Sequence, residues 1–384
     1  MCRIRTEDQA VWSSFRNEIR SLVETFAGGG YTSVRSIGAW SGDEIDPWAS
    51  TSFWGGRVYI LADTPSHRVL FPHTSWHIIL STQFIMQLTS IISFWALALF
   101  SLVLAAEPVP RGQLTQVNSY GNNPTGTKMS LYVPKNLKAN PAVVVALHYC
   151  GGTSQAYYQG TKWASNAEKY GFIVIYPQTP YSGGCWDVSS KMTLTHEGGG
   201  CSTSIANMAK YVLKQYNGDA KKVFVTGESS GAMMTNVMLA TYPDVFAAGS
   251  AYAGVPAGCF VSQANQAAAW NSTCSQGKSI YTQTQWANVV KNMYPGYNGA
   301  RPKFQIYHGT ADPTLNVQNY YEEIKQWTGI FGYSSTPKST TPNTPASPYT
   351  RQVFGDKFQA FLGQGIGHGN PHFDDNDLKW FGFI

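Results

Sequence analysis

Charged residues are scarce in this chain: they make up 13% of its 384 residues, against 43% for hydrophobic residues. The 27 lysines and arginines exceed the 22 acidic residues by only five, and no block of basic residues occurs. Proteins that bind nucleic acids concentrate positive charge to contact phosphates. The diffuse excess therefore argues against a nucleic-acid partner, and the composition is that of a globular protein.

Cysteines are few, and no two of them are spaced as C-x-x-C, which argues against a structural zinc site. Five lie in the C-terminal part of the chain: Cys150, Cys185, Cys201, Cys259 and Cys274. We expect Cys259 to pair with Cys274 across a short polar loop. Our second expected pair is Cys150 with Cys185, which leaves Cys201 free, although spacing alone does not determine connectivity.

Lysine is absent from residues 1–85, which carry seven arginines and eight acidic residues. Residues 86–384 hold seventeen lysines and only three arginines. This change indicates two stretches of different origin. Between them, the run from Ile78 to Ala106 contains no charged residue.

From Met86 this run resembles a secretory signal, with the apolar core IISFWALALFSLVLAA and Val103-Leu104-Ala105 as a small-residue cleavage site. No positive charge lies near Met86, and the full uncharged run is long enough to act instead as a membrane-spanning signal-anchor. We favour secretion without stable membrane association. The expected organisation is a mispredicted or disordered extension at 1–85, a signal peptide at 86–105, a short propeptide-like linker at 106–111, and one domain at 112–384.

Strands and helices alternate along that domain. Residues 141–147 and 172–176 are apolar runs typical of parallel strands covered on both faces. The remaining expected elements are strands at 222–226 and 304–307, a strand pair in 351–362, an apolar stretch at 246–252, helices at 163–170, 205–216, 232–240, 283–293 and 316–327, and a surface loop at 334–348. Their order predicts a doubly wound α/β fold, with a mostly parallel sheet and helices on both faces.

The stretch VTGESSGAMM, residues 225–234, ends a predicted strand and opens a predicted helix. Its G-x-S-x-G pattern arises easily by chance in a glycine-rich chain. However, a strand before it and a helix after it are the context of a nucleophile elbow. In an elbow, positions 227 and 231 need glycine for a steric reason, because the helix is crowded against the strand and leaves no room for a side chain. Ser229 is the candidate nucleophile, and the alternative is a plain glycine-rich turn.

A serine nucleophile needs a base, and the base needs an orienting acid. In the α/β-hydrolase fold these follow the nucleophile in the order acid, base. Of the domain's histidines only His368 and His372 come late enough. His368 lies in a loop directly after a strand and is the expected base. His372 follows Pro371 among acidic residues and is expected at the surface, and the proline argues against a helical metal-binding pair.

Asp312 is the expected acid, because it follows a short apolar strand by a few residues. Its alternative role is to cap the next helix. Asp374 and Asp375 lie on the same tail as His368, and Asp187 comes before the nucleophile. We expect His308 to be a hydrogen-bonded histidine at the end of a strand.

The oxyanion that forms on attack needs two N–H donors. One is expected from Ser230, the residue after the nucleophile. The other is expected from the glycine-containing loop at 147–152, with the amide of Cys150 or Tyr149 as the candidate. The sequence therefore predicts acyl transfer to water. Asn271-Ser272-Thr273 is an N-glycosylation acceptor, which suits an exported protein.

Five segments occur in this order: ALHYCGG, GGCWD, GESSGAMMTNVMLATYPDVFAAGSAYAG, HGTADPTLNVQN and GIGHGNP. Together they resemble fungal acetylxylan esterases of carbohydrate esterase family 1, which are related to feruloyl esterases and polyhydroxybutyrate depolymerases. The resemblance covers residues 107–384. It implies a secreted, monomeric α/β-hydrolase that removes acetyl groups from acetylated xylan and needs no cofactor.

By motif, the resemblance assigns the nucleophile to Ser229, the acid to Asp312 and the base to His368. It also matches Trp270 to an aromatic residue that supports the sugar chain, and a partly buried packing tryptophan is the alternative. Gly369-Asn370 departs from the bulkier residues expected after the base, which could alter the rim of the site.

Substrate choice is open at this point, because ester hydrolysis follows from the site but the acyl group does not. A feruloyl esterase is the nearest alternative and needs a roomy aromatic slot. A depolymerase or lipase needs an apolar rim, whereas these loops are rich in Tyr, Trp, Asn and Gln. A lectin-like binder without catalysis would not need the Ser, Asp and His set.

Overall fold

The computed structural model describes residues 109–384. The expected extension at 1–85, the signal peptide at 86–105 and the start of the linker lie outside the described residues. Within residues 109–384 no helix is both long and apolar enough to cross a membrane.

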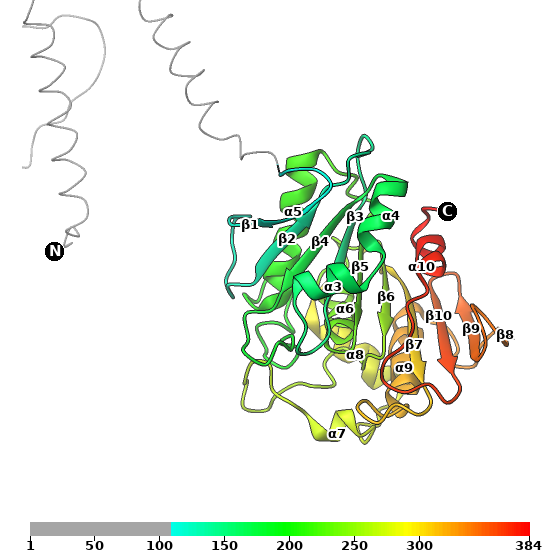
Figure 1. Ribbon diagram of the computed structural model, residues 1–384. Coiled ribbons are helices and arrows are strands. Elements are labelled where there is room, and N and C mark those ends of the chain that lie inside the picture. Colours follow the sequence, from blue (N-terminus) through cyan, green and yellow to red (C-terminus); the bar gives the residue numbers. More distant parts are fainter. Residues whose placement is uncertain (1–108) are drawn as a thin grey trace, which may run out of the picture. The chain divides into compact units, whose positions relative to one another are not determined.

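Ten strands form one sheet in the order β1-β2-β4-β3-β5-β6-β7-β10-β9-β8 (Figure 1). The strands are β1 (Leu114–Val117), β2 (Lys128–Tyr132), β3 (Val143–Leu147), β4 (Ile173–Gln178), β5 (Val223–Glu228), β6 (Ala248–Tyr252), β7 (Lys303–Gly309), β8 (Ser339–Thr341), β9 (Tyr349–Gly355) and β10 (Phe358–Gly363). The helices are α3 (Ser154–Gly160), α4 (Trp163–Tyr170), α5 (Cys201–Tyr216), α6 (Ser230–Thr241), α7 (Ser272–Ser275), α8 (Gln283–Met293), α9 (Gln318–Phe331) and α10 (Asp374–Phe381).

The centre of the sheet is parallel, from β4 through β3, β5, β6 and β7 to β10. Antiparallel strands flank it, with β1 and β2 on one side and β9 and β8 on the other. Parallel strands covered on both faces have apolar residues at successive positions, and β3 (VVVAL) is buried throughout. The predicted doubly wound α/β fold with a mostly parallel sheet is confirmed.

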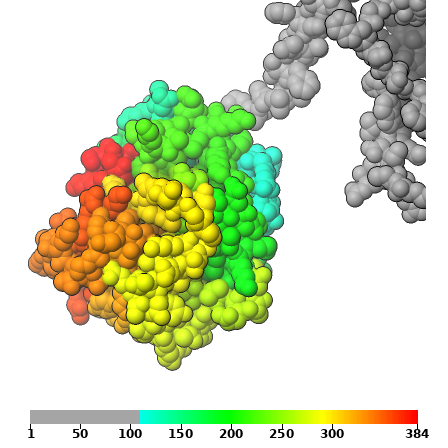
Figure 2. Space-filling view, turned by 180° about the vertical axis from the view of Figure 1, so that it is seen from behind, coloured from blue at the N-terminus to red at the C-terminus, as the bar shows by residue number. Residues whose placement is uncertain are grey.

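Helices cover both faces of the sheet, and each face has its own apolar core. One core joins Val143, Val145 and Leu147 of β3 to side chains from α5, α6, α8 and α9. The other joins Val144 and Ala146 of the same strand to side chains from α3, α4 and α10. Figure 1 shows α3 and α4 in front of the sheet, and Figure 2 shows the molecule from behind, where the yellow and orange parts of the chain form much of the surface.

Helix α6 lies entirely inside the protein, since each of its twelve residues is buried. It packs between β5, β6 and the helices α5 and α8. A helix buried on all sides is apolar all round rather than amphipathic, and AMMTNVMLA fits that description. Its N-terminus is thereby fixed at the carboxyl end of β5, directly after Ser229.

One expectation about the C-terminal part is wrong. The segment 334–348, expected as a surface loop, contains the short strand β8, which pairs with β9 at the edge of the sheet. The acidic stretch after His372, for which the sequence predicted no helix or strand, forms the helix α10, which packs against the sheet.

Candidate active site

Ser229 stands at the sharp turn between β5 and α6. Its backbone has φ 52° and ψ −117°, a conformation that glycine adopts readily and other residues rarely do. The turn is held from both sides. The amide of Ser229 donates to the carbonyl of Tyr252 at 2.8 Å, and its carbonyl accepts from the amide of Met233 at 2.9 Å. The predicted strand, elbow and helix are therefore all present.

The two glycines of the elbow lie where no side chain fits. A Cβ on Gly231 would lie 2.2 Å from the carbonyl oxygen of Leu147, so α6 touches the backbone of β3 there. A Cβ on Gly227 would lie 2.5 Å from the carbonyl group of Gly231. These contacts give the physical reason for the G-x-S-x-G pattern.

Three strands of the parallel part of the sheet bring three polar side chains together at their carboxyl ends. Ser229 follows β5, Asp312 follows β7 and His368 follows β10. The last two strands pair in parallel, with Gly309 opposite Gly363. Nε2 of His368 lies 2.8 Å from Oγ of Ser229, and Nδ1 of His368 lies 2.8 Å from Oδ2 of Asp312. Ligand sites in such sheets lie at the carboxyl ends of the strands.

The carboxylate of Asp312 is fully buried and strongly hydrogen-bonded. Its Oδ1 accepts from the amides of Thr314 and Leu315 at 2.8 and 2.9 Å, so it also caps the turn after β7. Burial acts to raise the pKa of Asp312, but the hydrogen bonds from His368 and Leu315, with His308 nearby, outweigh burial and leave the pKa below its usual value. The carboxylate is ionised and holds the imidazole of His368.

His308 is the hydrogen-bonded strand-end histidine that the sequence predicts. Its side chain is fully buried, and its Nε2 lies 2.9 Å from the carbonyl oxygen of Leu315. The same nitrogen lies 3.4 Å from Oδ2 of Asp312. Burial lowers its pKa, so His308 is neutral and supports the turn that carries the acid.

The two residues with candidate oxyanion amides, Ser230 and Cys150, line the cavity that holds Ser229. Ser230 is the first residue of α6, where amides lack a partner within the helix. Cys150 lies in the loop after β3 and lines the same cavity as Ser229 and Ser230, as does Tyr149. The amide of Cys150 donates no hydrogen bond to another residue within 109–384. Both residues therefore lie at the cavity, and the donation of their amides to an oxyanion stays a prediction.

The hydroxyl of Ser229 faces a cavity of about 460 Å³. Apolar side chains make up much of its wall, namely Trp186, Val188, Met233, Phe260 and Leu315. Trp270 stands at its rim with 58% of its surface exposed, and its ring meets Phe260 edge to face at 5.2 Å. Trp270 therefore packs on Phe260 with part of its surface while most of that surface is exposed, and its role in binding stays a prediction.

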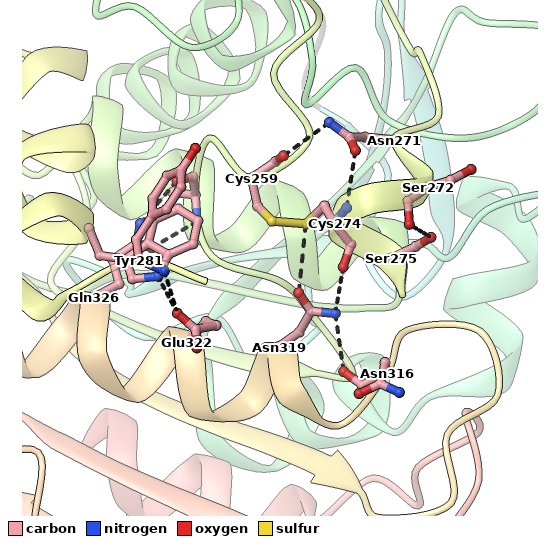
Figure 3. The surroundings of a disulfide bond; sticks show 12 residues. Cys259, Asn271, Ser272, Cys274, Ser275, Tyr281, Asn316, Asn319, Glu322 and Gln326 are labelled. Atoms are coloured by element: carbon pink, nitrogen blue, oxygen red, sulfur yellow. Dashed lines mark hydrogen bonds between the residues drawn. A yellow bond between two sulfur atoms is a disulfide. The ribbon is translucent and has the colours of Figure 1, made fainter. Parts of the chain in front are cut away.

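Both expected disulfides are present. Cys150–Cys185 joins the candidate oxyanion loop to the segment before Trp186, and Cys259–Cys274 joins the loop after β6 to α7. Figure 3 shows the second bridge beside Asn271, whose side chain accepts from the amide of Cys274 at 3.0 Å. Among residues 109–384 the one free cysteine is Cys201, which is buried, and burial raises its pKa to about 11.

His372 is not the surface residue that its acidic neighbours suggested. Its side chain is only 17% exposed and stacks on the ring of Tyr252. Its Nε2 lies 3.3 Å from the carboxylate of Glu228, the residue before the nucleophile. Burial lowers the pKa of His372, but Glu228 and nearby acids outweigh burial, and the pKa lies above its usual value. No local pattern in the sequence indicates this pair, because the two residues lie 144 positions apart.

A mostly parallel sheet that carries a serine elbow, with a histidine and an acid on later strands, defines the class of α/β-hydrolases. The family model described as "Esterase PHB depolymerase" matches residues 128–333. Acetylxylan esterase A of Emericella nidulans is 59% identical over 278 residues, which are 72% of this chain and 91% of that protein. Acetylxylan esterase A of Aspergillus oryzae is 60% identical over 277 residues, 72% of this chain and 90% of that protein.

A solved structure is likewise similar to this chain. The acetyl xylan esterase from Aspergillus awamori superposes with a TM-score of 0.71 at 55% identity, covering 71% of this chain and all of that one. The chain belongs to the acetylxylan esterase family, and it is a carboxylic ester hydrolase.

Proposed function

We propose that this protein removes acetyl groups from acetylated xylan through an acyl-enzyme formed on Ser229. One observation carries the proposal: the unbroken hydrogen-bonded chain from Ser229 through His368 to Asp312, which opens on a cavity. The names of the relatives support the acetyl group and the polysaccharide as substrate.

In the first half of the reaction, Nε2 of His368 takes the proton of Ser229 as Oγ attacks the acetyl carbonyl carbon. Negative charge develops on the carbonyl oxygen, and the amides of Ser230 and Cys150 stabilise it. The bond between the acetyl carbon and the sugar oxygen then breaks as His368 gives its proton to that oxygen, so the sugar leaves with a free hydroxyl and the acetyl group remains on Ser229. Asp312 keeps the proton of the neutral imidazole on Nδ1 and stabilises the imidazolium that forms.

In the second half, water takes the place of the sugar. His368 removes a proton from the water as its oxygen attacks the acetyl carbon, and the same two amides stabilise the second oxyanion. Collapse releases acetate and returns the proton to Oγ of Ser229. Acid and base chemistry are supplied by one histidine, so this chain's own residues complete the cycle.

A feruloyl esterase is the second candidate, and the cavity supplies the observation that favours it. Its volume of about 460 Å³ and its walls of Trp186, Phe260 and Leu315 could take an aromatic acyl group. The test is acetate release from acetylated xylan beside hydrolysis of methyl ferulate, with the wild-type protein and its Ser229→Ala variant. We expect acetate release that disappears in the variant. Faster cleavage of ferulate would assign the protein to the second candidate.

We also propose that the protein acts outside the cell as a monomer and carries a glycan on Asn271. The apolar run that ends at Ala106 supports export. Nδ2 of Asn271 donates to the carbonyl of Cys259 at 3.4 Å, and a glycosylated amide keeps one N–H for that bond. Mass spectrometry of protein from the culture medium tests export through the mature N-terminus and glycosylation through the mass of the 271 peptide, and light scattering of the purified protein tests the monomer. An unprocessed N-terminus at Met1 would contradict export from Met86.

A further inference from the structure

Asp187 is a buried carboxylate that the proposed mechanism does not use. It is 1% exposed and follows Trp186, which lines the cavity. Its Oδ1 accepts from the amides of Ser189 and Ser190 at 3.0 Å, and its Oδ2 accepts from the hydroxyls of Ser190 and Thr193 at 2.5 and 2.7 Å. Burial acts to raise its pKa, but the bonds from Ser190 and Thr193 outweigh burial, so the pKa is lowered and the carboxylate is ionised.

The same carboxylate reaches a second loop, far away in the sequence. Oδ1 of Asp187 also accepts from the amide of Ala268 at 3.0 Å. The hydroxyl of Ser189 donates to the carbonyl of Gln266 at 2.8 Å and accepts from the amide of Ala269 at 2.9 Å. Three successive bonds therefore fix residues 266–269, and the next residue is Trp270.

Two residues of this second loop have unfavourable backbone conformations, which need contacts with other segments to persist. Asn265 and Ala268 have φ values of 55° and 51°, in the left-handed region that non-glycine residues rarely occupy. Such conformations persist only where the surroundings determine them. At Ala268 the surrounding group is Asp187, and at Asn265 the side chain accepts from the amide of Lys191 at 2.7 Å.

Beyond Trp270 the chain is anchored again. Asn271 caps α7 through the amide of Cys274 and donates to the carbonyl of Cys259 (Figure 3). Trp270 thus lies between two fixed points while 58% of its surface faces solvent at the rim of the cavity. An exposed aromatic ring on a fixed backbone is suited to stack on the face of a sugar ring, since its conformation is set before binding.

We propose that Asp187 is a positioning residue for substrate binding: with Ser189, it fixes the loop 265–269 and so places Trp270 to hold the polysaccharide chain beside Ser229. The inference rests on the proposed function. It assigns Asp187 and Ser189 to the binding of the polymer and not to the chemistry of the ester.

The test uses a matched pair of serines, because removing Asp187 itself could unfold the protein. The hydroxyls of Ser189 and Ser190 both lie within hydrogen-bond distance of the carboxylate of Asp187, at 3.1 and 2.5 Å, but of the two hydroxyls only that of Ser189 bonds residues 266–269. We expect Ser189→Ala to raise KM for acetylated xylan about threefold to tenfold, as the loss of such bonds predicts. Its kcat on 4-nitrophenyl acetate should fall less than twofold. Ser190→Ala, the control, should leave both values unchanged.

A double-mutant cycle completes the experiment. Trp270→Ala should raise KM for xylan by at least as much as Ser189→Ala. The double variant should have the same KM as Trp270→Ala alone, because both substitutions abolish the same contact between Trp270 and the polysaccharide. Equal effects of Ser189→Ala and Ser190→Ala on both substrates, or independent effects of Ser189→Ala and Trp270→Ala, would overturn the inference. An unchanged KM in Trp270→Ala, with acetate still released, overturns it too and leaves the esterase. Absence of acetate release by the wild type would instead overturn the proposed function.

Discussion

Oδ2 of Asp312 lies 2.8 Å from Nδ1 of His368, although 56 positions separate the two residues in the sequence. The contact exists because β7 and β10 are parallel neighbours and end side by side. Their loops are tied further by the amide of Ala311, which donates to the carbonyl of Ile366 at 2.9 Å. The acid and the base are therefore held together by the pairing of their strands and by the bond between their loops.

Asp312→Asn should lower kcat by about 10³-fold to 10⁴-fold with little change in KM. An amide nitrogen in place of Oδ2 would face Nδ1 of His368 and favour the wrong tautomer for proton removal from Ser229. Steady-state kinetics on 4-nitrophenyl acetate would measure the effect. Asp375→Asn is the control, since Asp375 is exposed and lies close to His368 in sequence only. A loss of less than tenfold in Asp312→Asn would exclude Asp312 as the orienting acid.

Ser229→Gly should be more stable than Ser229→Ala by about 1 kcal/mol, although both variants lack the hydroxyl. Glycine adopts φ 52° and ψ −117° without strain, whereas alanine retains the Cβ that makes this conformation unfavourable. Urea unfolding of the two inactive variants, with equal m-values, would give the difference in free energy of unfolding. If the alanine variant proves as stable as the glycine variant, the elbow is not strained.

Gly231→Ala should lower the free energy of unfolding by about 3 kcal/mol or more, or prevent folding. The new methyl group would lie 2.2 Å from the carbonyl oxygen of Leu147, and backbone atoms cannot move away as a side chain can. Gly160→Ala, at the end of α3, has no atom within 4 Å of its new methyl group and serves as control. Thermal unfolding compares them. A wild-type melting temperature in Gly231→Ala would contradict the close approach of α6 to β3.

Glu322 and Glu323 are adjacent on α9 and equally buried, yet their pKa values move in opposite directions. Burial raises the pKa of Glu323 to about 8, since it has one hydrogen bond, from Nδ2 of Asn236. Burial acts on Glu322 in the same sense, but bonds from Lys325 and Trp286 outweigh it and lower the pKa.

The sign of each effect on stability follows from linkage. Glu323 contributes to the free energy of unfolding while it is protonated. This contribution is fully present below its unfolded-state pKa of 4.5 and is lost as pH rises through about 8, at about 1.4 kcal/mol per pH unit. Glu323→Gln should therefore be more stable than the wild type at pH 8. The contribution of Glu322 is present above 4.5 and is lost as pH falls through its lowered pKa, so Glu322→Gln should be less stable at pH 8. Urea unfolding from pH 5 to 8 tests the pair, and a shift of the same sign in both variants would contradict the assignment.

The sequence predicted the central strands and the elbow because both depend on local physical constraints. A strand such as β3, buried on both faces, requires an apolar run, and the turn at Ser229 requires glycines where backbones touch. The edge strands β1 (LTQV) and β2 (KMSLY) have no such run and were not predicted. Helix α3 (SQAYYQG) was missed because it is short and largely polar.

The sequence predicted only those parts of the candidate site that motifs and the order of residues along the chain can indicate. Motifs that follow predicted strands, in the order nucleophile, acid and base, indicate Ser229, Asp312 and His368. The role of Asp187 depends on Ala268, 81 positions away, and the place of His372 depends on Glu228. Such pairs form only when distant segments pack together, so composition and local spacing do not predict them.

The central claim is that Ser229 is the nucleophile, and covalent labelling tests it most directly. The protein would be treated with diethyl 4-nitrophenyl phosphate, digested and analysed by mass spectrometry as activity is followed. We expect one diethylphosphoryl group per chain, on Ser229, with activity lost in proportion to labelling, and no label in His368→Ala. A label on a different residue, or full activity after Ser229 is labelled, would contradict the account.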